Sequence, residues 1–387
     1  MNSLSYYNEI YNILVKLNCK FYYPESKLNN ITDFVCAFLC GGFDGKLSHI
    51  AKHCHSNKHR TSYGHFLNSN SFKDEYLKKI IQNEALVSMK HSSVSYIVID
   101  DTVCTKSKPS SQAVNPTESA QYHFSHKEHK KVYGHQVFQA LIKVDEKIFP
   151  YDFSLYNSNS ETKSDMAVKI IKSLKTDNKS YVLCDSWYTS EKLVSASLQQ
   201  GHHVIGGLKS NRIIYPNGVN IQIKDFVKFI SKSDTGLVTT GNNTYRVYRY
   251  EGNLKGIENA SVIICWDKDT DDFSKNFRCF LSTDTELTTE EILEHYSNRW
   301  TIEVFFRQQK QILSFEKHML RHKKAIERYW LLCEFSYFIA VYSTGINFVL
   351  SFYQFKIRYE ESIIEYVYNC ALNNYSLEII KHNLLIL

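Results

Sequence analysis

The spacing of apolar residues divides the chain into a helical first part and a mixed part that begins near Val94. In SYYNEIYNILVKL, ITDFVCAFL and FKDEYLKKIIQNEALV, apolar residues recur three or four positions apart, which predicts helices over residues 1–88. Gly41, Gly42 and Gly45 separate the second of these helices from the third. The first part is therefore expected to be an all-helical region.

Short apolar runs and amphipathic segments alternate over residues 89–210. Strands are favoured by VSYIVID, HQVFQALIKVD, KIFPYDFSLY, YVLCD and HHVIGGL, whereas SDMAVKIIKSLK and SEKLVSASLQQ have helical spacing. Their order is three strands, a helix, a strand, a helix and a strand. This order predicts an α/β (α+β mixed) fold, with a mixed sheet flanked by helices.

A β-rich insertion is predicted over residues 211–275, where turn sequences separate the strand-like runs YRVYRYEG and ASVIICWD. Residues 276–328 resume with the strand FRCFLSTD and continue into a long helix. That helix is expected to begin after Thr288, because Glu291 completes a Thr-x-x-Glu capping box. Residues 329–387 form a last, helical region.

One uncharged segment raises the question of a membrane. Phe335–Tyr353 spans 19 residues without a charge, which is close to the length of a membrane-spanning helix. Several small polar residues lie within it, and Glu334 precedes it directly. These features favour a buried helix of a large core, and we expect no membrane partner.

Charge and cysteine content narrow the class of protein. The formal net charge is only +6, so a nucleic-acid partner would require local clusters of positive charge. None of the ten cysteines forms a Cys-x-x-Cys pair, and the first residues include Glu9 and no long apolar run. We therefore expect reduced cysteines and a cytoplasmic protein.

A polar stripe lies on the helix predicted after Thr288. Tyr296, Arg299, Glu303 and Lys310 fall within an arc of about 60° on one helix face. Apolar residues surround the stripe, and buried charge is tolerated where it is paired or binds a metal. One carboxylate between two cations suits a site that holds a metal ion and a phosphate backbone.

Two further carboxylates close predicted buried strands. Asp101 ends VSYIVIDD and Asp185 ends SYVLCD, and a sheet could bring both close to Glu303. Three such carboxylates repel one another unless divalent cations bridge them, and magnesium prefers carboxylate oxygens. The alternative is structural: Asp185 could cap a turn or helix, and Asp100 or Asp101 could bond turn amides.

These motifs together resemble a known family. DDT at Asp100–Thr102, DSWY at Asp185–Tyr188 and the Tyr-x2-Arg-x3-Glu-x6-Lys pattern at Tyr296–Lys310 are similar to those of the DDE transposases of bacterial insertion sequences. The most similar group carries the YREK signature and includes the insertion-sequence-four family. The resemblance extends from Ser95 to Leu320, and GLKSNR at 207–212 also fits.

The resemblance implies an RNase H-like catalytic domain that is interrupted by the β-rich insertion, with residues 1–88 as a helical DNA-binding region. It implies that Asp101, Asp185 and Glu303 hold two Mg²⁺ ions, for which Mn²⁺ can substitute. The aspartate of the family stands directly before a Thr or Ser. Asp101 is therefore preferred over Asp100, because Thr102 follows it.

The resemblance also implies DNA contacts near the three acids. Arg299 suits a bidentate phosphate contact and Lys310 a point charge. Trp187 and Trp300 have two interpretations, either stacking on a base at the cut end or packing in the core. The predicted DNA-binding residues are Tyr296, Arg299, Lys310, Lys209, Arg212, Trp187 and Trp300.

Basic clusters next to this site could provide tracks for DNA, although a single cluster is usually a solvated face. One cluster comprises Lys106 and Lys108, and another is HFSHKEHKK at 123–131. A further cluster follows the predicted helix and comprises Lys317, Arg321, Lys323, Lys324 and Arg328.

We therefore predict a bacterial, nucleoid-associated transposase that acts on double-stranded DNA. It would bind the terminal inverted repeats, cleave at the element ends, join the 3′ ends to target DNA and work as a homodimer in the synaptic complex. Two alternatives stay open. One is a catalytically inactive or regulatory DNA-binding relative, and the other is an RNase H-like nuclease without strand transfer.

Overall fold

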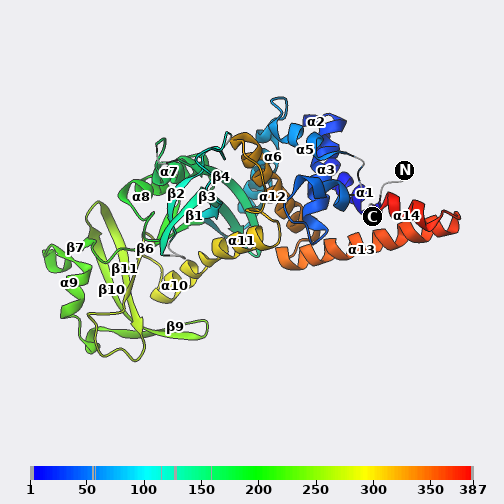
Figure 1. Ribbon diagram of the computed structural model, residues 1–387. Helices are drawn as coiled ribbons and strands as arrows, with labels where there is room; N and C mark the ends of the chain where they lie inside the picture. Colours follow the sequence, from blue (N-terminus) through cyan, green and yellow to red (C-terminus); the bar gives the residue numbers. More distant parts are fainter. Residues whose placement is uncertain are drawn as a thin grey trace.

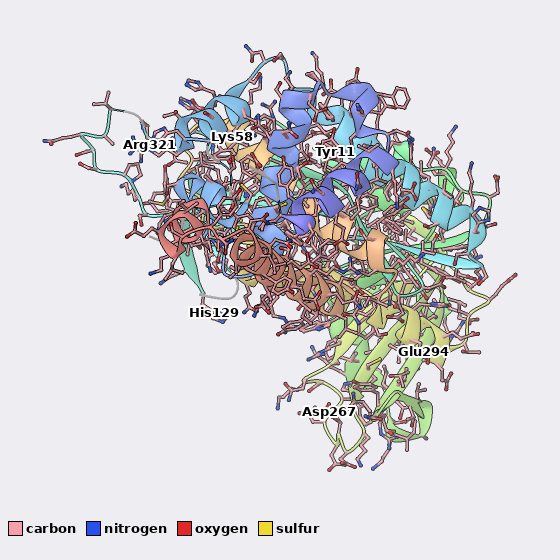
Figure 2. All side chains as sticks on the ribbon, turned by 90° about the vertical axis from the view of Figure 1, so that its right-hand side faces the viewer. Tyr11, Lys58, His129, Asp267, Glu294 and Arg321 are labelled. Atoms are coloured by element: carbon pink, nitrogen blue, oxygen red, sulfur yellow. The ribbon has the colours of Figure 1, made fainter. Side chains whose placement is uncertain are left out.

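The computed structural model describes residues 4–54, 56, 58–114, 116–125, 129–157 and 159–384. Figure 1 shows a helical part that carries both termini, a central sheet, and a β-rich lobe at the opposite end. Figure 2 places Asp267 on that lobe, away from Tyr11 in the helical part.

The helices predicted for the first part are confirmed. Phe34 and Phe38 are buried in the C-terminal half of the helix Glu25–Leu39, with their ring centroids 6.1 Å apart. The helices are α1 (Ser5–Lys16), α2 (Cys19–Tyr22), α3 (Glu25–Leu39), α4 (Leu47–Cys54), α5 (Arg60–Asn68) and α6 (Asp74–His91).

The predicted mixed sheet, and with it the α/β fold class, is confirmed. The core strands lie in the order β4–β3–β1–β5–β6–β12, and β1 pairs antiparallel with β3 but parallel with β5. Their bounds are β1 (Val94–Thr105), β2 (Gln121–Ser125), β3 (Lys130–Val144), β4 (Lys147–Tyr156), β5 (Lys179–Cys184), β6 (His203–Leu208) and β12 (Arg278–Ser282).

Helices cover both faces of this core sheet (Figure 1). The helices α7 (Lys163–Ser173) and α8 (Glu191–Gln199) lie on one face, while α10 (Thr289–Ser297) and α11 (Trp300–Gln311) lie on the other. Side chains on one face of β1 therefore lie toward α7 and α8, and side chains on the other face lie toward α10 and α11.

The segment between β6 and β12 extends the same sheet instead of forming a separate one. Its last strand pairs antiparallel with β12, and the strand before it pairs with that last strand. The elements are β7 (Ile213–Ile214), β8 (Ile221–Gln222), α9 (Ile223–Phe226), β9 (Gly236–Thr240), β10 (Asn243–Leu254) and β11 (Ile257–Asp267), with three short 3₁₀ turns.

The prediction of one long helix after Thr288 is wrong, because the chain forms two consecutive helices there, α10 and α11. The predicted capping box is present, since the Thr288 hydroxyl accepts from the Glu291 amide while the Glu291 side chain accepts from the Thr288 amide. After Ser297 the bonding tightens, and the Thr301 amide donates to the Asn298 carbonyl at 3.1 Å. Arg299 therefore lies at a break between α10 and α11.

The uncharged segment Phe335–Tyr353 is likewise divided between two helices. Its first part lies in α12 (Lys323–Thr344) and is buried as far as Val341, whereas its last part lies in α13 (Phe348–Leu372), with Phe348 and Ser351 buried and Leu350 and Tyr353 more than half exposed. Gly345, at φ 72°, ends α12 in the left-handed conformation, and α14 (Leu377–Asn383) follows α13.

The two helices are bent by 86°. Across the described ranges neither is long and apolar enough to cross a membrane alone, although the bent pair together meets the criteria of length and composition.

Two of the basic residues interpreted as DNA tracks hold the fold together instead, which corrects that prediction: Arg328 is buried and Lys106 is half-buried. Lys106 Nζ donates to the carbonyls of Glu316 and His318 at 2.6 and 2.9 Å. The Arg328 side chain is 0% exposed and pairs with Asp74 at 2.7 Å. Both side chains therefore join elements of the fold, because a buried cation must be paired or hydrogen-bonded. Within the cluster at 123–131, residues 126–128 lie outside the described residues.

We predict that Arg328→Met destabilises the fold by about 3–5 kcal/mol. The guanidinium also donates to four carbonyls, those of Phe66, Leu67, Ser69 and Phe72. Its loss leaves these acceptors and the Asp74 carboxylate without their partner. The measurement is urea unfolding, with Lys323→Met as the control.

Lys323 begins the same helix but is exposed, and its pair with Glu327 spans 3.8 Å. Its substitution should change the free energy of unfolding by no more than about 0.5 kcal/mol. Equal stability of the two variants would show that the buried network does not hold α12 against the first helices.

Candidate active site

The register between β1 and β5 decides which carboxylates share a face of the sheet. Tyr96 lies opposite Tyr181, and Val98 lies opposite Leu183, in a parallel pair. The Tyr96 hydroxyl contacts His295 Nδ1 of α10 at 2.8 Å, so this face is the one that α10 and α11 cover. Because side chains alternate along a strand, Asp100 also lies on this face, level with the residue that follows β5.

That residue is Asp185, which orders the turn at the end of β5. Its Oδ1 atom accepts from the amides of Trp187 at 2.8 Å and Tyr188 at 3.2 Å. The turn-capping alternative for Asp185 is therefore observed. It does not exclude a chemical role, because the second carboxylate oxygen makes no hydrogen bond among the described residues.

Asp100 is the most perturbed acid of this face. Burial, together with the negative charges of Asp101 and Asp185, raises the pKa of Asp100 to about 7. Its Oδ2 atom lies 3.5 Å from Nη1 of Arg299, and its Oδ1 accepts from the Asp101 amide at 2.8 Å. A cation at this position would favour the ionised carboxylate.

Arg299 joins two of the acids. Its Nη2 atom donates to Oε1 of Glu303 at 2.5 Å, while Nη1 faces Asp100. The break between α10 and α11 places the guanidinium between a strand carboxylate and a helix carboxylate. Across the described ranges no three Asp, Glu, His or Cys side chains lie close enough together to hold a metal ion, and Arg299 here supplies positive charge.

Asp101 does not join this group, which corrects the preference for it over Asp100. It points to the opposite face of β1, where Oδ1 accepts from Lys163 Nζ and the Tyr188 hydroxyl, each at 2.7 Å. Its Oδ2 accepts from Gln136 Nε2. The physical reason is the two-residue period of a strand, which sends neighbouring side chains to opposite faces.

Tyr296 packs between β12 and the turn after β5. Its ring lies 4.7 Å from that of Phe280, and burial raises its pKa to about 12. A Cβ atom at Gly207 would come within 3.2 Å of its hydroxyl and within 2.9 Å of the Ser186 amide nitrogen. Glycine at this position of β6 therefore allows Tyr296 and the Asp185 turn to approach each other.

The three predicted DNA-binding cations other than Arg299 differ in their surroundings. Lys310 Nζ donates to the Val103 carbonyl at 2.7 Å and lies 3.4 Å from Glu316, so it ties α11 to the end of β1. Lys209 is exposed just after β6. Arg212 is half-buried and donates to the Lys255 carbonyl at 3.3 Å. Of these, Lys209 is the most accessible to a ligand.

Both tryptophans are exposed, so the alternative that they pack in the core is wrong. Trp187 is 46% exposed and Trp300 is 57% exposed. The indole of Trp187 lies edge-on to Tyr188, with ring centroids 4.9 Å apart, and Lys163 Nζ lies 4.8 Å from its ring. Trp187 is therefore an ordered aromatic surface next to Asp185.

Sequence reasoning missed Asp100 as the acid that faces α11. It did not single out Lys163 or Gln136, and it named Tyr188 only as part of the DSWY motif, without a role. A signal for Asp100 was available: the residues Tyr96, Val98 and Asp100 share one face, and Asp101 does not. No local signal marked the other three, since their roles depend on contacts between distant segments.

The geometry defines a carboxylate site where the parallel pairing of β1 with β5 ends in a mixed sheet. Comparison with known proteins gives the class: residues 95–339 match the family described as "Transposase DDE domain". This match covers more than half of the chain, and the chain therefore belongs to that family. It is an enzyme that cuts and joins DNA. No curated protein sequence matches the chain at a significant level.

Among solved structures, the chain is similar to the piggyBac transposase in a synaptic complex with hairpin DNA. The TM-score is 0.52 at 12% sequence identity, over 97% of this chain and 82% of that chain. At this identity the likeness concerns the fold.

DDE transposases generally use divalent metal ions, and the chemical type of the donors in this site suits such an ion. The donor set consists of carboxylate oxygens, which hard divalent cations prefer. Burial and the neighbouring negative charges raise the pKa of Asp100, and a bound cation would counteract this shift.

We predict that the metal-free fold loses stability as Asp100 ionises. Its pKa is about 7 in the folded protein and about 4 in an unfolded chain. Between these values the folded state holds a proton that the unfolded state has lost, so the free energy of unfolding falls as the pH rises from about 4 to 7. Asp100→Asn cannot ionise and should gain stability relative to the unsubstituted protein over this range. Urea unfolding in EDTA at pH 5 and pH 8 measures this, and an unchanged difference between the two proteins would contradict it.

Proposed function

We propose that this chain is the transposase of a bacterial insertion sequence, of the insertion-sequence-four-like group with the YREK signature. It binds the terminal inverted repeats of its element, cleaves DNA at the element ends and joins the 3′ ends to target DNA. The observation that carries the proposal is the placement of Asp100, Asp185 and Glu303 on the face of the sheet that α10 and α11 cover, where Arg299 links Asp100 to Glu303. Residues of the YREK signature, Tyr296 and Arg299, lie on the same face.

The proposed metal ligands are Asp100, Asp185 and Glu303, and Mg²⁺ is the proposed ion, two per site, with Mn²⁺ as a substitute. When bound, such ions activate the attacking oxygen and stabilise the leaving oxygen of a phosphodiester. The turn amides of Trp187 and Tyr188 hold one oxygen of Asp185 and leave the other facing the site. Asp100 and Glu303, which now contact Arg299, would hold the ions together with Asp185.

Arg299 is then free to contact a phosphate, for which its planar fork is suited. In cleavage, a water oxygen attacks the phosphorus, the bond from phosphorus to the 3′ oxygen breaks, and a 3′ hydroxyl is left. In strand transfer, that hydroxyl oxygen attacks a phosphorus of the target, and a 3′ oxygen of the target leaves. Both steps use the same carboxylates and need no further acid or base from the chain.

The proposed domain division follows the sequence. Residues 1–88 form the DNA-binding region, residues 89–210 and 276–328 form the two parts of the catalytic domain, and residues 211–275 form the insertion. The exposed side chains of Lys209, Trp187 and Trp300 suit backbone and base contacts near the cut. Tyr296, Arg212 and Lys310 would have to shift from their present contacts to reach DNA.

We predict that Glu303→Gln and Asp100→Asn each abolish cleavage and leave end binding within about threefold. A catalytic carboxylate converted to an amide loses the charge that holds the ions, and losses of about 10³-fold or more are expected. Nicking of a duplex that carries the element ends, with Mg²⁺, measures cleavage, and a gel-shift assay in EDTA measures binding.

The matched control is Glu294→Gln, since Glu294 is an exposed glutamate of α10 (labelled in Figure 2). It should cleave at the unsubstituted rate. Cleavage by Glu303→Gln at that rate would remove Glu303 from the mechanism. End binding without cleavage by the unsubstituted protein would favour a regulatory relative, and cleavage without joining would favour a nuclease.

We further propose that the active species is a homodimer, and exposed apolar residues on α13 support this. Tyr353 and Leu372 are equally far along α13 from the point between Ser362 and Ile363, and so are Ile357 and Tyr368. All four are more than half exposed. A twofold interface is self-complementary, so an antiparallel pair of α13 helices would bring each of these residues against its counterpart. Large exposed apolar patches mark interaction surfaces.

We predict that Ile357→Glu with Tyr368→Glu weakens dimerisation on an end duplex by at least about tenfold, because two charges per chain enter an apolar contact. Sedimentation equilibrium of the protein bound to the duplex measures the dissociation constant. The control is Leu237→Glu on β9, which changes an equally exposed apolar residue on the distant lobe. Equal dissociation constants for both variants would place the dimer contact elsewhere.

A further inference from the structure

The second acid of the DDT motif has its own buried network on the face of β1 that lies away from α11. Asp101 and Lys163 form an ion pair at 2.7 Å, with side chains only 15% and 14% exposed. The Tyr188 hydroxyl donates to the same Asp101 oxygen, and Gln136 donates to the other. Three donors thus converge on one carboxylate, which is how a buried charge is stabilised.

Tyr188 connects this network to Asp185. The Tyr188 ring is 1% exposed and packs 5.9 Å from that of Phe138, so its hydroxyl and its backbone move together. The Tyr188 amide donates to Oδ1 of Asp185, as does the Trp187 amide. Tyr188 therefore links Asp101 to Asp185, although Asp101 lies on the face of the sheet opposite α11.

Lys163 connects the same network to Trp187. Its Nζ atom lies over the Trp187 ring at 4.8 Å and over the Tyr156 ring at 5.4 Å. A cation over an indole face restricts the ring. The ion pair Asp101–Lys163 therefore restrains the exposed Trp187 side chain of the turn. The hydrogen bond from the Tyr188 hydroxyl to Asp101 restrains the buried Tyr188 side chain of the same turn.

We propose that Asp101 is a positioning residue that acts through Tyr188 and Lys163 to hold the Asp185–Tyr188 turn, so that Asp185 faces Asp100. The inference rests on the proposed function, because Asp185 is a proposed metal ligand. Asp101 itself donates no oxygen to the ions, since Lys163, Tyr188 and Gln136 use both of its carboxylate oxygens. The two neighbouring aspartates thus have different tasks.

The experiment compares Asp100→Asn, Asp101→Asn, Tyr188→Phe and the double variant Asp101→Asn with Tyr188→Phe. Tyr188→Phe removes only the hydroxyl and keeps the packed ring. The measurements are Mn²⁺ binding by titration calorimetry without DNA, and kcat and KM for Mg²⁺-dependent nicking of an end duplex.

For Asp101→Asn and Tyr188→Phe we expect Mn²⁺ binding about tenfold weaker, kcat about tenfold lower and KM within about twofold, as for other residues that orient metal ligands. The double variant should lose no more than the worse single variant, because both changes break one path. Asp100→Asn should lose Mn²⁺ sites outright.

The matched control is Tyr250→Phe, which removes a buried hydroxyl that donates to Asn253 at 3.0 Å in the β-rich lobe. It should change neither Mn²⁺ binding nor kcat. Loss of Mn²⁺ sites in Asp101→Asn, as complete as in Asp100→Asn, would make Asp101 a ligand and overturn the inference. Mn²⁺ binding and kcat equal to those of the unsubstituted protein in Tyr188→Phe would also overturn the inference. This second variant provides the test even if Asp101→Asn does not fold. An unsubstituted protein that binds no Mn²⁺ would instead overturn the proposed function.

Discussion

The parallel pairing of β1 with β5 is the constraint on which the site depends. It fixes Tyr96 against Tyr181 and Val98 against Leu183, and this register places Asp100 level with Asp185. A shift by one residue would turn Asp100 away from α11 and would put Asp101 in its place. The pairing is rigid because both strands are central in the sheet and their apolar side chains are buried on both faces.

The two faces of β1 divide the work of the site between chemistry and support. On the face toward α11, Asp100 and Glu303 share the guanidinium of Arg299, and like charges held close together make the face receptive to added cations. On the other face, Asp101 has its full complement of donors and ties α7 to the turn after β5. A site on rigid strands with a second layer behind it keeps its geometry better than one on loops alone.

Much of the fold followed from local patterns, because periodicity and capping depend on neighbours in the chain. The strand and helix order of the core, the first helices and the Thr288 capping box were all predictable. So was the choice of Asp185 and Glu303 as candidate site residues. The break at Arg299 was not, since both halves continue the same helical pattern. Nor was the burial of Arg328, whose carbonyl partners are 256 to 262 positions away.

The sequence by itself determined that Asp100 and Asp101 point to opposite faces of a strand, that two more acids follow at strand and helix positions, and that the chain resembles DDE transposases. Only the tertiary structure decided which of the two faces meets the helix of Glu303, and therefore which aspartate stands with Asp185. The reason is physical: strand alternation is a local property of the backbone. The layer that covers each face is chosen by packing between segments that are far apart in the chain.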